Sequence, residues 1–302
     1  MDKVTKSQKV LKQQQPPMSV AEQIQNLKSL GLTIKDEAYA TSFLNSVSYF
    51  RFIKAYSLGL KPKNGKYYKG VKFEDIVELY QFNAKLRDAL FPQVAKAEIM
   101  LRCRIGNYFA LKYGAVGYKN KENFATYTEK FESDIKREIN RNSRTLFIRN
   151  FQQNYEGGEI PIYALFEILS FGMLSKFFKN MHNADKKEVA LTFGVSYPYL
   201  ESWMESIAYV RNICAHYGRL YNTNFTKKPK LYKDDIDRGI TNTQIMGTLA
   251  CLNRLIPHDV AWTTFIDTLE ALLEKYPHAK KEALGFPDDW KEVLEDKGIT
   301  LQ

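Results

Sequence analysis

The segment RNICAHYGRLYN, residues 211–222, holds the side chains of this chain that are best suited to chemistry. Arg211 lies five residues before His216, and Asn212 lies four residues before it. Histidine takes up and returns a proton near neutral pH, and arginine offers a permanent charge in a planar fork that fits a phosphate. Such a pair supplies what metal-free RNA cleavage needs, because the ribose 2′-hydroxyl is itself the nucleophile and DNA lacks it.

A single helix does not bring these three side chains to one point. At about 100° and about 1.5 Å per residue, Asn212 and His216 share a face, whereas Arg211 is about 140° around the axis from His216 and about 7.5 Å along it. A second helix or a second subunit is therefore needed to surround one phosphate. The free carbonyls at the helix end also favour a cationic side chain at His216.

An Arg and a His near a helix end are more often a surface ion pair and a cap, and a short motif alone does not decide between the two interpretations. The residues that follow favour the chemical one. Arg219, Tyr221 and Asn222 come directly after the histidine, and such side chains contact phosphates and bases in RNA complexes. We therefore expect them to bind RNA.

Further basic side chains extend the candidate RNA-binding set. Three arginines at helical spacing form a stripe that suits a phosphate backbone, although an ordinary solvated face explains the stripe equally well. Another arginine is spaced to pair with Glu98 at i,i+4. This pair supports the helix structurally, or the arginine faces the site. A basic loop after the motif adds a lysine. These candidates are Arg137, Arg141, Arg144, Arg102 and Lys228.

The composition limits the remaining possibilities. The chain has 302 residues and a net charge of +10, which attracts polyanions such as RNA, DNA or an anionic membrane. Its cysteines, Cys103, Cys214 and Cys251, are far apart, so neither a disulfide framework nor a zinc site is indicated and a reducing cytoplasm fits best. No nucleotide-binding loop, zinc-protease or hydrolase pattern occurs, and we expect no metal and no cofactor.

A membrane partner is not expected. The most apolar stretch, YALFEILSFGMLSKFF from Tyr163, contains Glu167 and Lys176 and so falls short of the ~20 uncharged residues of a bilayer span. The N-terminal residues carry charges where a signal peptide needs an apolar core. Residues 1–18 are interpreted as a flexible tail.

The elements before the motif divide into two parts. Residues 19–72 are expected to form a small α+β unit, in which Ser19 and Glu22 make a capping box, a helix runs from about Asp36 to Tyr56, and Asn64-Gly65 turns a short hairpin. Residues 73–225 are expected to form a helical bundle. It begins with one long helix from Phe73 to about Gly114, with Pro92 as a kink.

The motif itself is expected at the end of a helix from about Pro198 to Tyr217, with Gly218 as its C-terminal cap. Residues 226–302 then provide a basic loop and C-terminal helices that pack on the bundle. The chain is therefore predicted to be mainly α.

The string from Arg211 to His216 matches the R-N-x-x-x-H motif of HEPN ribonucleases. RNICAHYGRLYN also resembles the signature of the Abi-like family, the AbiD/AbiF-type proteins of phage abortive infection, and four other segments resemble that family's landmarks in the same order. One landmark departs from the family pattern, because Phe82-Asn83 stands where the family often has Phe-Asp. The four segments are YFRFIKAY, FEDIVELYQFNAKLRDAL, KAEIMLRCRI and ILSFGMLSKFFKNM.

The resemblance implies a HEPN helical bundle that acts as a metal-independent endoribonuclease toxin in phage defence, with the Arg/His helices of two copies facing each other in a homodimer. His216 would transfer protons, Arg211 would stabilise the phosphate and Asn212 would orient one or the other. A neutralising partner, either a protein antitoxin or a small structured RNA, is also implied. The alternative is a non-catalytic module that binds a specific small RNA or a partner protein, and a DNA-binding regulator is a third, weaker possibility.

Overall fold

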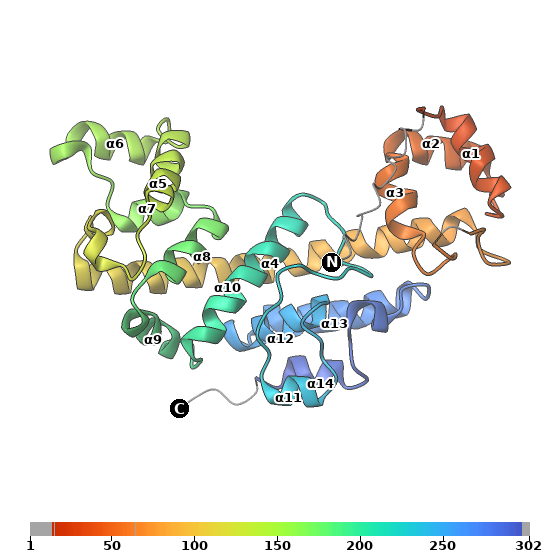
Figure 1. The fold of residues 1–302 in the computed structure, drawn as a ribbon. Helices are drawn as coiled ribbons and strands as arrows, with labels where there is room; N and C mark the ends of the chain where they lie inside the picture. The colour runs from red at the N-terminus through yellow and green to blue at the C-terminus, as the bar shows by residue number, and fades with distance from the viewer. Residues whose placement is uncertain (1–13, 15, 64, 298–302) are drawn as a thin grey trace, which may run out of the picture. The chain divides into compact units, whose positions relative to one another are not determined.

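The computed structural model describes residues 14, 16–63 and 65–297, so residues 1–13 and 15 of the predicted tail lie outside the described residues. The chain divides into two compact units at Tyr80 and Gln81. In the described ranges, fourteen α-helices and four short 3-10 helices are joined by loops, and β structure is limited to isolated bridges (Figure 1). The predicted mainly α class is confirmed.

The first unit contains three short helices and the beginning of a long one. The predicted capping box is present, since the Ser19 hydroxyl accepts from the Glu22 amide at 3.3 Å and a Glu22 oxygen accepts from the Ser19 amide at 2.6 Å. The aromatic rings of Phe43, Phe52 and Phe73 pack against one another at centroid distances of 4.7–6.0 Å. The helices are α1 (Val20–Ser29), α2 (Glu37–Ser46), α3 (Tyr49–Tyr56) and α4 (Phe73–Tyr113).

The single helix predicted from Asp36 to Tyr56 is in fact two helices. Val47 adopts an extended backbone, and the Ser48 hydroxyl then caps α3 by accepting from the Arg51 amide at 3.3 Å. The capping hydroxyl provides a local alternative to a continuous helix.

The predicted hairpin around Asn64-Gly65 is wrong. Asn64 lies outside the described residues, and the described flanking segment forms only isolated bridges. One backbone bond crosses the predicted turn, from the Tyr68 amide to the Leu60 carbonyl at 3.1 Å. Others go to the end of α1 and the loop after it: Tyr67 donates to the Leu30 carbonyl at 2.8 Å, and Thr33 donates to Val71 at 3.0 Å. Because a continuous ladder would need the groups bonded to Leu30 and Thr33, the described residues of this segment form no two-stranded ribbon.

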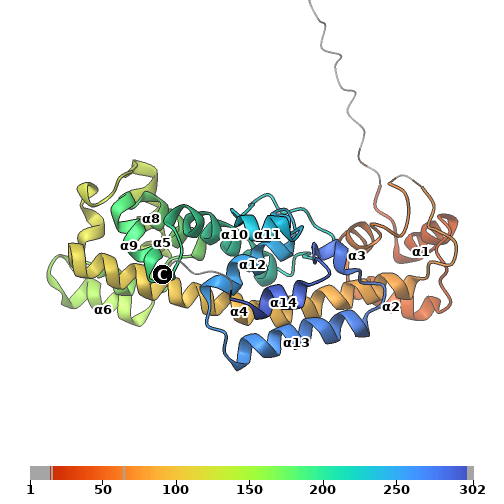
Figure 2. The same ribbon diagram turned by 90° about the horizontal axis from the view of Figure 1, so that it is seen from below.

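The second unit is built on the part of α4 that begins at Gln81, and α4 continues without interruption through Pro92. Ten further α-helices follow in the described chain (Figures 1 and 2). They are α5 (Glu129–Arg141), α6 (Leu146–Asn154), α7 (Ile162–Ile168), α8 (Phe171–Asn180), α9 (Asn183–Leu191), α10 (Tyr197–Ala215), α11 (Lys233–Asp237), α12 (Ile245–Leu255), α13 (Val260–Lys275) and α14 (Trp290–Glu295).

Helix α10, which carries the motif, lies at the centre of the second unit. It packs against α8, α9 and α12, and Figures 1 and 2 show these neighbours beside it. Its fully buried positions, including Trp203, Ile207 and Val210, recur at spacings of four and three residues, whereas Glu205 and Asn212 are exposed. The buried face fixes α10 in the core and directs the motif outward.

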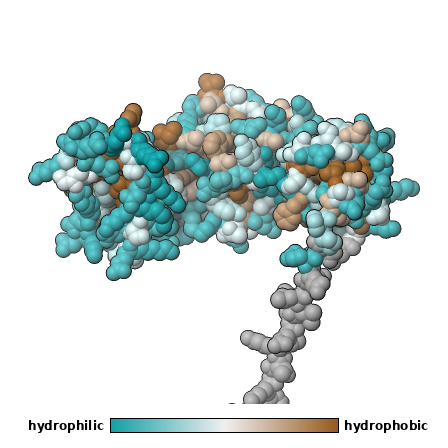
Figure 3. Space-filling model, turned by 90° about the horizontal axis from the view of Figure 1, so that it is seen from above, coloured by the Kyte–Doolittle hydropathy of each residue, from teal (hydrophilic) through white to brown (hydrophobic). Residues whose placement is uncertain are grey.

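The surface seen in Figure 3 is mostly hydrophilic, with small hydrophobic groups between the polar side chains. Within the residues that the structure describes, no single helix combines the length and the apolar composition of a membrane span. Only the bent pair Glu156–Ile168 and Phe171–Asn180, at 115° to each other, passes that test together.

Candidate active site

The C-terminal end of α10 forms a Schellman motif that fixes the residues after the histidine. His216 is the C-cap, the Tyr217 amide donates to the Cys214 carbonyl at 3.2 Å, and the Gly218 amide donates to the Ile213 carbonyl at 2.7 Å. The prediction that Gly218 is the C-terminal cap is wrong, because the cap is His216, and the left-handed residue is Tyr217, with φ of 54°.

Gly218 is nevertheless required by the close approach of the chain to α10. A Cβ at this position would lie 2.9 Å from Cγ2 of Ile213 and 3.2 Å from its carbonyl oxygen. The helix thus ends at Ala215 because the chain folds back across its last turn. His216 is exposed at this end, next to Tyr217, which is 70% exposed. The imidazole is therefore accessible to a ligand.

The Arg211 guanidinium is held by a buried carboxylate on α4. Its Nε donates to Oε2 of Glu98 at 3.2 Å, and Glu98 also pairs with Arg102 one turn further along α4. Arg102 in turn donates to the Phe166 carbonyl. The Glu98 side chain is only 10% exposed, whereas that of Arg211 is 36% exposed. One carboxylate thus orients two arginines, one on α4 and one on α10.

A second pair of α4 side chains holds the loop after the histidine. The fully buried Asn83 accepts from the backbone amides of Leu220 and Tyr221 at 2.8 and 3.0 Å and donates to the Gly218 carbonyl at 3.3 Å. Arg87 donates to the same carbonyl at 2.9 Å. Asn83 is the residue that departs from the family's aspartate. Its amide both accepts and donates, which a carboxylate cannot do.

Cys214 lies inside the motif but does not contribute a nucleophile. It is buried, and burial raises the pKa of its thiol to about 12 although the nearby Arg87 lowers it somewhat. The thiol therefore stays protonated at neutral pH, and only a thiolate is an effective nucleophile. The arginine, asparagine and histidine remain as the candidate chemical groups of the motif.

The residues just after the motif have different environments. Tyr221 is buried, its hydroxyl accepts from the Lys280 amide at 3.1 Å, and burial raises its pKa. The backbone of Asn222 is left-handed, with φ of 48°, and its amide donates to the Ala283 carbonyl at 3.0 Å. Arg219 is half-buried. In this structure Tyr221 and Asn222 connect the motif to the C-terminal part of the unit.

The predicted arginine stripe is partly on a helix. Arg137 and Arg141 lie on the exposed face of α5, where each forms an ion pair with an acidic residue three positions before it, at 2.6 and 3.3 Å. Arg144 is exposed but lies beyond the end of α5, because the Asn142 side chain caps the Glu138 carbonyl at 2.9 Å. The three arginines therefore do not lie on one helix.

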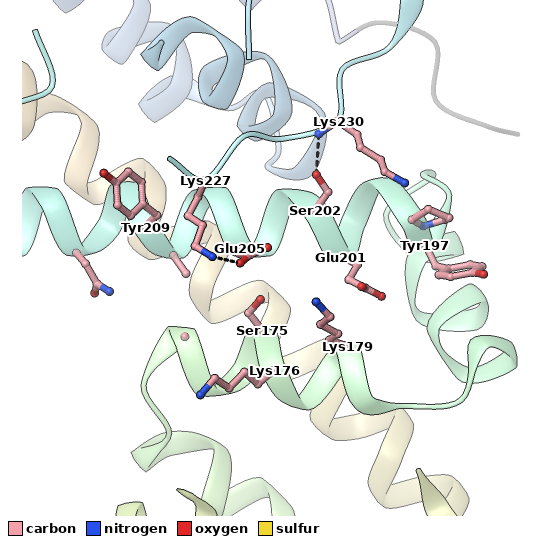
Figure 4. A pocket seen from close by; sticks show the side chains of 14 residues that line it. Ser175, Lys176, Lys179, Tyr197, Glu201, Ser202, Glu205, Tyr209, Lys227 and Lys230 are labelled. Atoms are coloured by element: carbon pink, nitrogen blue, oxygen red, sulfur yellow. Dashed lines mark hydrogen bonds and ion pairs between the residues drawn. The ribbon is translucent and has the colours of Figure 1, made fainter. Parts of the chain in front are cut away.

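Asn212 lines a groove of about 640 Å³ between α8, α10 and the loop after α10 (Figure 4). Lys228 is exposed in that loop, and its neighbours Lys227 and Lys230 line the groove. Within the described ranges, no three His, Cys, Asp or Glu side chains are grouped closely enough to hold a metal ion.

Sequence reasoning missed two contributions to the site. Glu98 was predicted to support Arg102, but its contact with Arg211 joins residues 113 positions apart, which no local pattern reveals. Lys176 and Lys179 were not singled out, although their i,i+3 spacing in the lysine-bearing segment LSKFFKN places them on one helix face. One weak indication of the role of Asn83 was visible in the sequence, namely its departure from the family pattern.

The fold and the site define a helical protein whose exposed histidine and anchored arginine lie at the end of a central helix. The family model described as "Abi-like protein" matches residues 42–222, which include α10 and the motif, and the chain belongs to this family. The membership indicates a role in abortive infection defence. No curated protein and no solved structure matches the chain.

Proposed function

We propose that the chain is a metal-independent endoribonuclease of the HEPN type that acts as a toxin in phage abortive infection. The observation that supports this best is the arrangement of the arginine and the histidine of the motif. Arg211 is oriented by the buried Glu98, and His216 is exposed at the end of the same helix. A fixed guanidinium and an accessible imidazole near the same helix end suit phosphate chemistry, in which charge develops on the non-bridging oxygens.

In the proposed reaction the ribose 2′-oxygen attacks the adjacent phosphorus. Its proton passes to an imidazole, the bond from phosphorus to the 5′-oxygen breaks, and the leaving oxygen receives a proton from an imidazolium. The products are a 2′,3′-cyclic phosphate and a 5′-hydroxyl. Arg211 stabilises the negative charge of the transition state, and Asn212 orients the phosphate or His216.

The base and the acid act on opposite sides of one phosphorus, so one imidazole does not fill both roles in a single step, and the chain has one in the motif. Because Arg211 and His216 are separated by about 7.5 Å along α10 and about 140° around it, a second copy of the helix end completes the site. The proposal therefore includes a homodimer in which two such ends face each other. It also includes a cytoplasmic location and a neutralising partner, either a protein antitoxin or a small structured RNA.

The direct test is cleavage of RNA by the purified chain in the presence of EDTA. Wild-type protein is expected to cleave a single-stranded RNA, and His216→Ala and Arg211→Ala are each expected to lower kcat at least 100-fold, because proton transfer and charge stabilisation each contribute about that factor. Circular dichroism should show unchanged helix content, since both side chains lie at the surface end of α10. Cleavage that strictly requires magnesium ions would contradict the mechanism.

A binding module without catalysis is the second candidate. The ion pair with Glu98 supports it, because a partly neutralised Arg211 suits holding a ligand as well as stabilising a transition state. In that case the same variants would weaken RNA affinity several-fold, and the wild-type protein would show no turnover above a buffer control.

A further inference from the structure

The groove along α10 leads to the motif. It runs from Tyr197, the first residue of α10, to Asn212, which is next to Arg211. At about 1.5 Å per residue the groove is about 22 Å long. Figure 4 shows that its sides come from α8, from α10 and from the loop after α10. A ligand lying in the groove would thus end beside the candidate active site.

Lysines from two separate segments line the groove. Lys176 and Lys179 come from α8, and Lys227 and Lys230 come from the loop (Figure 4). Lys179 and Lys230 are exposed, and within the part of the chain that the structure describes they form no ion pair. Two cations of the groove, one from α8 and one from the loop, therefore remain available for an anionic ligand.

The acidic side chains of the groove are paired with cations. Glu201 forms an ion pair with the buried Lys186 at 2.9 Å, and Glu205 pairs with Lys227. Each carboxylate is thus neutralised, so it offers little repulsion to an incoming phosphate. The electrostatic field in the groove is therefore set mainly by Lys179 and Lys230.

The groove also has aromatic residues and a fixed wall. Tyr197 and Tyr209 line it three turns apart on α10, and tyrosine rings are surfaces on which unpaired bases stack. The Lys230 amide donates to the Ser202 hydroxyl at 2.6 Å, which ties the loop to α10 (Figure 4). Lysines combined with aromatic rings along one track are typical of a site for a single nucleic-acid strand.

We propose that this groove binds a single strand of RNA and guides its phosphodiester to Arg211 and His216. The proposal rests on the proposed function, because it names the track by which the substrate reaches that site. At about 3.4 Å of length for each phosphate of a stacked strand, the groove accepts about six nucleotides. Lys179 from α8 and Lys230 from the loop contact the phosphates.

The test measures binding and cleavage separately. Binding is followed by fluorescence anisotropy of a fluorescein-labelled 12-nucleotide single-stranded RNA, in a His216→Ala background so that the probe stays intact. The double variant Lys179→Ala/Lys230→Ala is compared with Lys130→Ala/Lys187→Ala, which removes two exposed lysines that lie outside the groove. Both variants lower the net charge equally, so any difference in RNA affinity between them is due to the positions of the lysines. Cleavage is then measured with each pair of substitutions in the wild-type background.

The groove variant is expected to bind the RNA about tenfold more weakly than the control at 0.1 M salt. Its plot of log K against log salt should be shallower by about 1.4, since each lost phosphate contact on a single strand lowers the slope by about 0.7. Its kcat/KM should fall by a similar factor. Equal affinity, equal salt slope and equal cleavage in the two variants would overturn the groove proposal. If wild-type protein does not cleave RNA at all, the proposed function fails, and the binding comparison still decides the groove.

Discussion

Arg211 has its orientation because of Glu98. The carboxylate is buried. One of its oxygens accepts from Arg211 at 3.2 Å, and the other forms an ion pair with Arg102. A buried carboxylate between two guanidiniums is compensated on both sides, so it is a stable anchor. It also lowers the net charge that Arg211 presents to a ligand. Glu98 thus helps Arg211 by orienting it and weakens Arg211 by reducing its net charge. A neutral residue in place of Glu98 separates these two effects.

Glu98→Gln is expected to lower kcat for RNA cleavage about tenfold to 100-fold while RNA affinity stays equal or increases. The amide preserves the volume but removes the charge that orients Arg211, and small displacements of a catalytic group carry costs of this size. The measurement is single-turnover cleavage together with anisotropy. Glu188→Gln, on the exposed face of α9, is the control. A parallel loss of affinity and kcat would argue against a positioning role for Glu98.

The loop after α10 is held through contacts with α4 that are distant in sequence. Asn83 and Arg87 contact the backbone of the loop, and the Arg87 guanidinium lies 5.8 Å from the centre of the Tyr217 ring. Tyr217 tolerates its left-handed backbone because these contacts fix the turn. The position of His216 thus depends on α4 as well as on α10.

Asn83→Leu is expected to destabilise the protein by about 3 kcal/mol, because it leaves the buried amides of Leu220 and Tyr221 without an acceptor. Asn83→Asp keeps the acceptor, loses the donor to the Gly218 carbonyl and adds a buried charge that the nearby Arg87 partly compensates, so its cost should be smaller, about 1–2 kcal/mol. Urea unfolding followed by circular dichroism measures both. A larger loss for the aspartate than for the leucine would contradict this role of Asn83.

Helices α4 and α9 are joined by a buried carboxylate. Asp185, which is fully buried, accepts from the hydroxyls of Tyr108 and Tyr113 at 2.8 and 2.6 Å and pairs with Lys112. Burial alone would raise the pKa of Asp185, but the hydrogen bonds from Lys112, Tyr113 and Tyr108 outweigh it and hold the pKa below its usual value. The folded state therefore favours the ionised carboxylate.

Because the folded pKa of Asp185 is depressed, its contribution to stability is fully present above the unfolded pKa of about 3.9 and is lost as the pH falls through the lower folded value. Asp185→Asn is expected to destabilise the protein by about 2 kcal/mol at pH 7 and to flatten the fall in stability below about pH 4. Urea unfolding at pH 7, 4 and 3 measures this. An unchanged pH dependence in the variant would show that other carboxylates are responsible.

The net charge of +10 gives the whole chain a field that attracts RNA. Where basic side chains form ion pairs with acidic neighbours, they are less available to RNA, so specific binding is expected where they do not. On α5 the arginines are paired with acidic neighbours, whereas Lys179 and Lys230 face the groove beside the motif. We therefore expect long-range attraction over much of the surface and specific binding near α10. The proposed homodimer would bring two such grooves to one pair of motifs.

Features encoded within a few residues were predictable from the sequence. The capping box of Ser19 and Glu22 and the long helix α4 follow from adjacent side chains and from periodicity. The hairpin failed because Tyr67 bonds to Leu30, a choice that depends on tertiary context. The motif was visible as a string. Its anchors, Glu98 and Asn83, were not, since each lies more than 110 residues away from its partner.

The proposed mechanism is defined by the bonds made and broken at the scissile phosphate, and the ends of the RNA products identify those bonds. Wild-type protein is incubated with a defined single-stranded RNA in EDTA, and the masses of the fragments are determined by mass spectrometry. The 2′-hydroxyl mechanism predicts 2′,3′-cyclic phosphate and 5′-hydroxyl ends, which are absent with His216→Ala and with a substrate that is 2′-deoxy at the cleaved nucleotide. Fragments with 3′-hydroxyl and 5′-phosphate ends, or continued cleavage of the 2′-deoxy substrate, would contradict the mechanism.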